Sequence, residues 1–173
     1  TSTNNYPFQT SGIYGGSEGF LSTSTDGKLL MLGGYATSAN IADITATSAS
    51  TTSRAVGTVN QSGFFSQVAT SNTFYNGNDI RGAVSDGINY WASGASAASV
   101  DGIDYFGPGT QVGLGTAAIP PKAYGLRIFN GNMYYSSQKA GPVNTATNLG
   151  IFQLGTGLPT SGTPSVTQVI GTG

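Results

Sequence analysis

Three tight-turn dipeptides mark the repeat of this chain. Asp26-Gly27, Asp86-Gly87 and Asn130-Gly131 each stand between a short polar stretch and an aliphatic or aromatic run. A two-residue hairpin turn needs positive φ at its central positions, which Gly adopts freely and which Asn or Asp adopts more readily than most residues. The chain therefore predicts three β-hairpins, centred on these dipeptides.

A second pair of strands is predicted behind each hairpin, at 54–68, 102–114 and 149–170. The turns at positions 26, 86 and 130 are separated by 60 and then 44 residues. Four strands repeated about every 40 to 50 residues is the period of β-propeller blades. We expect an all-β fold with about three four-stranded antiparallel blades at 19–70, 78–115 and 122–171. Residues 1–18 are expected to form a strand or loop of a preceding blade.

An all-β sandwich is the alternative, because about twelve short strands would give similar turn spacing. Residues 36–53 show no helical period, so we expect a surface loop there. Closed propellers have about four to eight blades, and three blades leave an apolar face open at each end. We therefore expect a partner that completes the ring: a complementary fragment of the same precursor, or further copies of this chain.

Composition limits the possible functions. Only 8% of the residues are charged, and the net charge is −1. Nucleic-acid binding requires clustered Lys and Arg, so we expect no nucleic-acid partner. No apolar run approaches the roughly 20 residues of a membrane helix, which argues against membrane insertion. The uncharged, Ser/Thr/Asn-rich surface favours an extracellular or cell-surface protein, in which Asn60 of Asn60-Gln61-Ser62 is a candidate glycosylation site.

The chain lacks side chains on which many enzymes depend. It has no His and no Cys, which removes the commonest general base, the thiol nucleophile and the best transition-metal ligands. We expect no cofactor and no metal site. Asp26 and Asp86 are interpreted as turn formers, because Asn130 holds the equivalent position without a charge.

Charged and tyrosine side chains gather near the start of the first strand of each unit. In propellers these innermost strands line the central channel, and ligands bind at its mouth. We expect a ligand-binding polar ring there, made of Glu18, Asp79, Arg81, Lys122, Tyr124 and Arg127. The alternative is that these charges form ion pairs between neighbouring blades, such as Glu18 or Asp79 with Arg81.

Adjacent aromatic residues occur in three predicted strands, as Tyr90-Trp91, Tyr105-Phe106 and Tyr134-Tyr135. Neighbouring strand residues face opposite sides, so one of each pair is expected in the core, and the other could stack on a sugar ring. Trp91 is expected to pack between blades.

The missing catalytic side chains, the uncharged polar surface and the aromatic pairs favour a non-enzymatic extracellular binding or structural module, for carbohydrate or another matrix component. The alternative is a lyase or glycoside hydrolase that uses Glu18 and Asp79 as paired carboxylates.

Several stretches resemble a family of Gly/Ser/Thr-rich β-propeller proteins of bacteria and some algae, many of them predicted to be secreted or at the cell surface. The stretches are SEGFLSTSTDGKLLMLGGY (17–35), NDIRGAVSDG (78–87), IFNGNMYYSS (128–137) and GIFQLGTGLPT (150–160). The similarity covers most of the chain apart from 36–53 and 138–148. In that family the full propeller domain is roughly twice as long, so the resemblance implies an internal portion of about three blades. It implies no catalytic residues.

Overall fold

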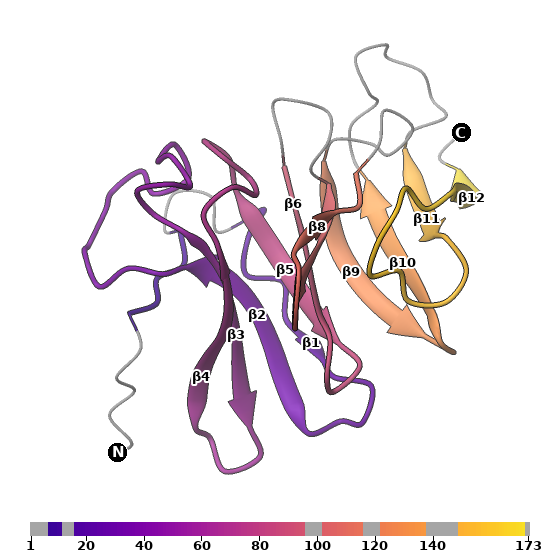
Figure 1. The fold of residues 1–173 in the computed structure, drawn as a ribbon, viewed down its shortest axis with the longest axis horizontal. Helices are drawn as coiled ribbons and strands as arrows, with labels where there is room; N and C mark the ends of the chain where they lie inside the picture. The colour runs from indigo at the N-terminus through magenta and orange to yellow at the C-terminus, as the bar shows by residue number, and fades with distance from the viewer. Residues whose placement is uncertain (1–6, 12–15, 96–101, 116–121, 138–148, 172–173) are drawn as a thin grey trace.

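The fold is all-β. The computed structural model describes residues 7–11, 16–95, 102–115, 122–137 and 149–171. These described residues form three four-stranded antiparallel sheets and no helix. In every sheet, strands that follow one another in the chain are also neighbours in space (Figure 1). The predicted all-β fold and its three units of four strands are confirmed.

The strands of each sheet follow in chain order. Sheet 1 contains β1 (Ser22–Thr23), β2 (Leu29–Tyr35), β3 (Arg54–Asn60) and β4 (Phe65–Ser71). Sheet 2 contains β5 (Ile80–Ser85), β6 (Tyr90–Gly94), β7 (Ile103–Gly107) and β8 (Val112–Gly113). Sheet 3 contains β9 (Ala123–Phe129), β10 (Asn132–Ser137), β11 (Gly150–Leu154) and β12 (Val166–Gly171). No helix in the described part of the chain has the length and apolarity needed to cross a membrane.

The predicted hairpins join the first two strands of every sheet. In sheet 3, Asn130 (φ 47°) and Gly131 (φ 72°) both have positive φ, as a two-residue turn requires. In sheet 1, Asp26 Oδ1 accepts a hydrogen bond from the backbone N–H of Lys28 at 3.2 Å. Asp86 makes contacts of the same kind with two backbone N–H groups of its own turn. The interpretation of both Asp residues as turn formers is confirmed.

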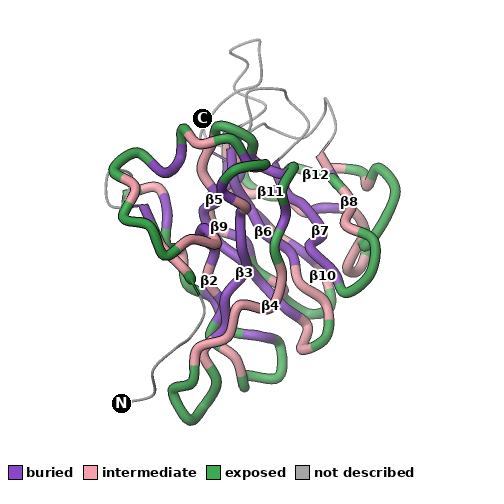
Figure 2. Tube along the Cα trace, turned by 60° about the vertical axis from the view of Figure 1, so that its left-hand side comes forward, coloured by how far each residue is buried: buried purple, intermediate pink, exposed green. Residues whose placement is uncertain are grey.

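Sheet 2 lies between the other two sheets. Its first strand, β5, contacts β2 of sheet 1 on one side and β9 of sheet 3 on the other. Every residue of β5 is buried, whereas the edge strands β4 and β12 are half-buried to exposed over most of their length (Figure 2). The middle sheet is therefore covered on both faces.

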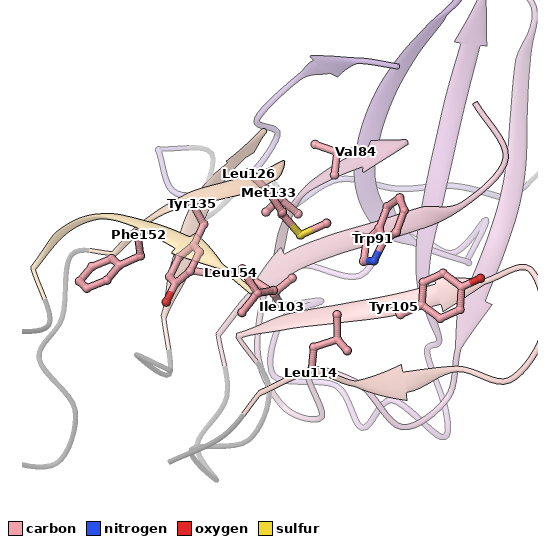
Figure 3. Close-up of a cluster of buried hydrophobic side chains, with 11 residues drawn as sticks. Val84, Trp91, Ile103, Tyr105, Leu114, Leu126, Met133, Tyr135, Phe152 and Leu154 are labelled. Carbon is pink, nitrogen blue, oxygen red and sulfur yellow. The ribbon is translucent and has the colours of Figure 1, made fainter. Parts of the chain in front are cut away.

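The only tryptophan belongs to the hydrophobic cluster between sheets 2 and 3. Trp91 is fully buried, and its indole Nε1 donates a hydrogen bond to the Pro159 carbonyl at 2.6 Å. Apolar side chains of both sheets pack around it (Figure 3), among them Val84, Ile103, Leu114, Leu126, Met133 and Leu154. Burial of one such side chain stabilises the fold by about 1.5–3 kcal/mol. The position of Trp91 between two sheets agrees with the prediction.

The aromatic pairs differ between sheets. In sheet 2, Tyr105 and Phe106 are 5% and 2% exposed, so both rings of this pair lie in the core and neither is exposed for stacking on a sugar ring. The reason is that sheet 2 has a neighbour on each face, and each ring enters a different hydrophobic cluster. In sheet 3, Tyr135 is buried and Tyr134 is half-buried, as alternation predicts for a sheet covered on one face.

The first strands of the three sheets lie close together. The Phe20 N–H donates to the Arg81 carbonyl at 3.0 Å, and Phe20 forms a parallel bridge with Gly82. From sheet 3, Arg127 Nη2 donates to the Leu21 carbonyl at 2.6 Å. Sheet 1 is thus linked directly to both other sheets through residues 20–21, next to its short first strand.

Residues 7–11 also pack against sheet 1. The backbone of Gln9 exchanges two hydrogen bonds of 2.9 Å with Tyr35 in β2, and Phe8 contacts the Phe65 ring at 4.9 Å between centroids. Residues 7–11 and 16–18 are the described part of 1–18, the segment predicted for a preceding blade; residues 1–6 and 12–15 lie outside the described residues. The loop 36–53 has no helix or strand, as predicted, but Ile44 and Ala49 are buried, so it is not entirely a surface loop.

Candidate functional site

A pocket of about 420 Å³ lies where the three sheets meet, at the start of β5 and β9. One wall comes from residues 43–46 in the loop after β2, a second from 77–81, and a third from 122–124. Small-molecule sites have volumes of about 300–1,000 Å³, so the pocket has a suitable size. Four of the six residues predicted to form a polar ring line it: Asp79, Arg81, Lys122 and Tyr124.

Arg81 contacts two other side chains that line this pocket, those of Asp79 and Tyr124. Its Nε donates to Asp79 Oδ2 at 2.6 Å, and the two side chains are 4% and 14% exposed. The guanidinium carbon lies 3.7 Å from the centroid of the Tyr124 ring, a cation–π contact. The predicted ion pair between Asp79 and Arg81 is confirmed, but it forms within one sheet. The contact with Tyr124 is one of the links between sheet 2 and sheet 3.

Two other charged residues of the pocket form no ion pair with any residue that the structure describes. Lys122 starts the third wall, and no carboxylate of the described residues lies within 4 Å of its ammonium group. Asp43 lines the first wall and accepts a hydrogen bond from the Thr45 hydroxyl at 2.8 Å, with no cation of the described chain in reach. Both groups are available to a bound molecule.

Glu18 does not line the pocket. It is 7% exposed, and its carboxylate accepts hydrogen bonds from the Tyr35 hydroxyl at 2.8 Å and from the Ser11 N–H at 3.1 Å. Burial raises the pKa of Glu18 to about 7, because removal from water disfavours the charged form more than these two hydrogen bonds favour it. The carboxylate of Asp79 raises this pKa further. Glu18 is therefore a buried acid that titrates near neutral pH.

Arg127 also lies outside the pocket. Besides its bond to Leu21, its Nη1 donates to the carbonyl of Leu126 at 2.9 Å. Arg127 lines a separate depression of about 290 Å³ on the outer face of sheet 3, together with Tyr134 and Ile151. The structure thus brings four of the predicted site residues together and places Glu18 and Arg127 elsewhere.

Arg54 shapes the pocket, although its sequence context does not reveal this. It is fully buried at the start of β3, and its guanidinium group donates to four backbone carbonyls at 2.7–3.0 Å: those of Thr45, Thr47, Thr52 and Asn78. Burial lowers the pKa of Arg54, and its guanidinium carbon lies 5.2 Å from the centre of the Tyr35 ring. Because Thr45 and Asn78 line the pocket, this one side chain holds two of its walls together.

The wall at 77–79 is fixed by close packing behind it. Tyr75 has a φ of 50°, which is unusual for a bulky residue. Its ring packs on Phe106 at 6.3 Å between centroids, and its hydroxyl donates to the Ala92 carbonyl at 2.8 Å. A Cβ atom at Gly94 would lie 2.5 Å from the Asp79 carbonyl and 2.7 Å from the Tyr75 ring, so only glycine fits there.

Asn60, the candidate glycosylation residue, ends β3 and begins the turn to β4. It is exposed, and its side-chain oxygen accepts hydrogen bonds from the N–H groups of Ser62 and Phe64, both at 3.0 Å. Its predicted location in an accessible turn is confirmed. Glycosylation at Asn60 stays a prediction.

No protein family, curated protein or solved structure matches this chain.

The described residues include no group of three or more Asp, Glu, His or Cys side chains placed to hold a metal ion. The pocket lining offers charged hydrogen-bond donors and acceptors beside one aromatic ring, that of Tyr124. Carboxylates and an ammonium group of this kind can bind hydroxyl, carboxylate and amine groups of a small polar molecule.

Proposed function

We propose that this chain is a portion of a β-propeller and works as a non-enzymatic extracellular binding module, with a carbohydrate bound in the pocket at the junction of the three sheets. The observation that carries the proposal is the pocket itself. One small volume has polar walls from three sequence-distant segments, 43–46, 77–81 and 122–124. Convergent polar groups in a concave site are typical of small-ligand binding.

The arrangement of the sheets supports the propeller assignment. Each sheet is a four-stranded meander in chain order, as in a propeller blade. Residues next to the first strands make direct contacts between sheets, including the parallel bridge from Phe20 to Gly82. The middle sheet has a neighbour on both faces, which suits a radial stack of blades better than the two layers of a sandwich.

The outer sheets support the proposal that partner sheets complete a ring. Most of the large apolar side chains that are more than a third exposed in the described residues lie in, or directly beside, strands of sheets 1 and 3: Leu21, Leu30, Phe64, Phe129, Val169 and Ile170. Exposed apolar surface of this kind is typical of a face that another subunit or segment covers. A complementary fragment of the same precursor or further copies of this chain would both supply such sheets.

The contacts made by the Glu18 and Asp79 carboxylates favour binding over catalysis. A glycoside hydrolase would need Glu18 and Asp79 to flank one substrate bond. Asp79 is paired with Arg81, and Glu18 is held by Tyr35 and Ser11 outside the pocket. The described chain therefore does not present the two carboxylates to the same molecule.

A glycan array followed by titration calorimetry tests this function. The informative variant is Asp43→Asn, because Asp43 lines the pocket and its side chain bonds only to Thr45 among the described residues. The matched control is Asp26→Asn, in an exposed turn. We expect a glycan that binds wild type and the control equally and binds the Asp43 variant at least about tenfold more weakly. Absence of glycan binding, or an unchanged Asp43 variant, would contradict the proposal; turnover in an activity screen would favour the enzyme alternative.

A further inference from the structure

Two acidic and two basic side chains line the pocket, but only one acid and one base among these described residues form an ion pair. Arg81 and Asp79 neutralise one another at 2.6 Å. In the described part of the chain, Lys122 and Asp43 have no such counter-ion. A ligand that fits the pocket therefore meets one cationic and one anionic group that are not already paired.

Lys122 is better placed than Arg81 to hold an anionic group of a ligand. The Nε of Arg81 is engaged by Asp79, its Nη1 lies 3.5 Å from the Ala123 carbonyl, and its plane lies over Tyr124. The ammonium of Lys122 has three donors and no carboxylate on the described protein to compete with a ligand. Charge-assisted hydrogen bonds of ammonium to carboxylate are among the stronger polar contacts of proteins.

The acidic residues restrict what kind of anion can enter. Asp43 lines the pocket and forms no ion pair with a described residue, so a second negative charge of a ligand would be repelled beside it. The Asp43 carboxylate has one hydrogen bond, from Thr45, and its remaining lone pairs can accept hydrogen bonds from hydroxyl groups. The pocket thus suits a molecule that has one carboxylate and several hydroxyls.

We infer that the pocket selects an acidic sugar of the uronic acid type, with its carboxylate on Lys122 and its hydroxyls on Asp43. The inference rests on the proposed carbohydrate-binding function and names the class of sugar. It also assigns separate roles to the two residues: Lys122 distinguishes acidic from neutral sugars, and Asp43 holds the sugar in either case.

The test is calorimetric titration with short oligomers of glucuronic, galacturonic and mannuronic acid and with their methyl esters, which keep the hydroxyls but lose the charge. We expect wild type to bind at least one acid about tenfold or more tightly than its ester, and added salt to reduce this preference. Lys122→Met should remove the preference, and Lys122→Arg should retain part of it. The control Lys28→Met changes an exposed lysine of the β1–β2 turn and should bind as wild type does. Buried Trp91 fluorescence reports whether each variant is folded.

The outcomes separate this inference from the function on which it rests. If esters bind as tightly as acids, or if the preference persists in folded Lys122→Met, the acidic-sugar inference is wrong and carbohydrate binding stands. If no sugar, acidic or neutral, binds while amino acids or other zwitterions do, both proposals are wrong.

Discussion

Replacement of Glu18 by glutamine should change how the stability of this protein depends on pH. Glu18 is buried, and its pKa is about 7 in the folded chain compared with an ordinary value of 4.5. Below pH 4.5 the carboxyl group is protonated in both folded and unfolded chains and contributes no difference. Between pH 4.5 and 7 the unfolded chain loses this proton and the folded chain keeps it, so the free energy of unfolding falls as pH rises.

The size of this effect follows from the two pKa values. The difference between about 7 and 4.5, at about 1.36 kcal/mol for each pKa unit, corresponds to about 3 kcal/mol. The loss should be complete slightly above pH 7 and constant beyond it. The glutamine side chain of the variant does not titrate, so Glu18→Gln should gain about 3 kcal/mol relative to wild type between about pH 4.5 and 8. The glutamine also makes different hydrogen bonds to Tyr35 and Ser11, and this changes the free energy of unfolding by an amount that does not depend on pH in this range.

Urea unfolding of wild type and Glu18→Gln at about pH 4.5, 6 and 8 measures this difference directly. Asp26→Asn is the control, because Asp26 is exposed and a hydrogen bond from the Ser24 hydroxyl lowers the pKa of its carboxyl group. Because the pKa of Asp26 is lowered from an ordinary value of 3.8, this carboxyl group is almost fully ionised in both folded and unfolded chains from about pH 4.5 upward, so the stability difference between Asp26→Asn and wild type should stay nearly constant across the series. The reasoning is refuted if the stability difference between Glu18→Gln and wild type is the same at all three pH values.

Three further predictions concern the architecture around the pocket. Arg54→Met should lower the free energy of unfolding by about 3 kcal/mol or more, because it removes the guanidinium donor from four buried or partly buried carbonyls, of which Thr47 alone keeps another donor, the Gly77 N–H; a loss below about 1 kcal/mol in chemical unfolding would show that these Arg54 hydrogen bonds are unimportant for stability. Gly94→Ala should cost about 1–3 kcal/mol from overpacking, whereas Gly16→Ala, with open space around it, should cost far less. Trp91 should emit at short wavelength and resist iodide quenching, since it is fully buried; ready quenching would mean that sheets 2 and 3 are not packed together.

Turn chemistry makes most of the fold predictable from sequence. Asn-Gly and Asp-Gly have few backbone alternatives, so the hairpins and the strands beside them follow from local residues. The sequence predicts the last strand pair within 149–170, and the structure has β11 (Gly150–Leu154) and β12 (Val166–Gly171) there. Four pocket residues are predictable for the same reason: they lie at the starts of first strands, and first strands of repeated sheets meet at one place.

Contacts between distant segments are not predictable in this way. Arg54 is a single basic residue with no motif around it, and its partner Asn78 lies 24 residues away; an arginine among small residues in a chain of so few charges is the only signal that could have suggested a buried role. Glu18 is bound to Tyr35 and Ser11 because residues 7–11 return to sheet 1. Local sequence shows the strand starts but not which neighbour each side chain reaches.

The most direct test of the central claim is amide chemical-shift mapping during titration with a uronic acid oligomer. We propose that one ligand contacts the loop after β2 of sheet 1 and the residues at the starts of β5 and β9 at the same time. We expect the largest shifts to fall together in segments 43–46, 77–81 and 122–124. Shifts confined to one sheet, or centred on the depression beside Arg127 and Tyr134 on the outer face of sheet 3, would contradict it.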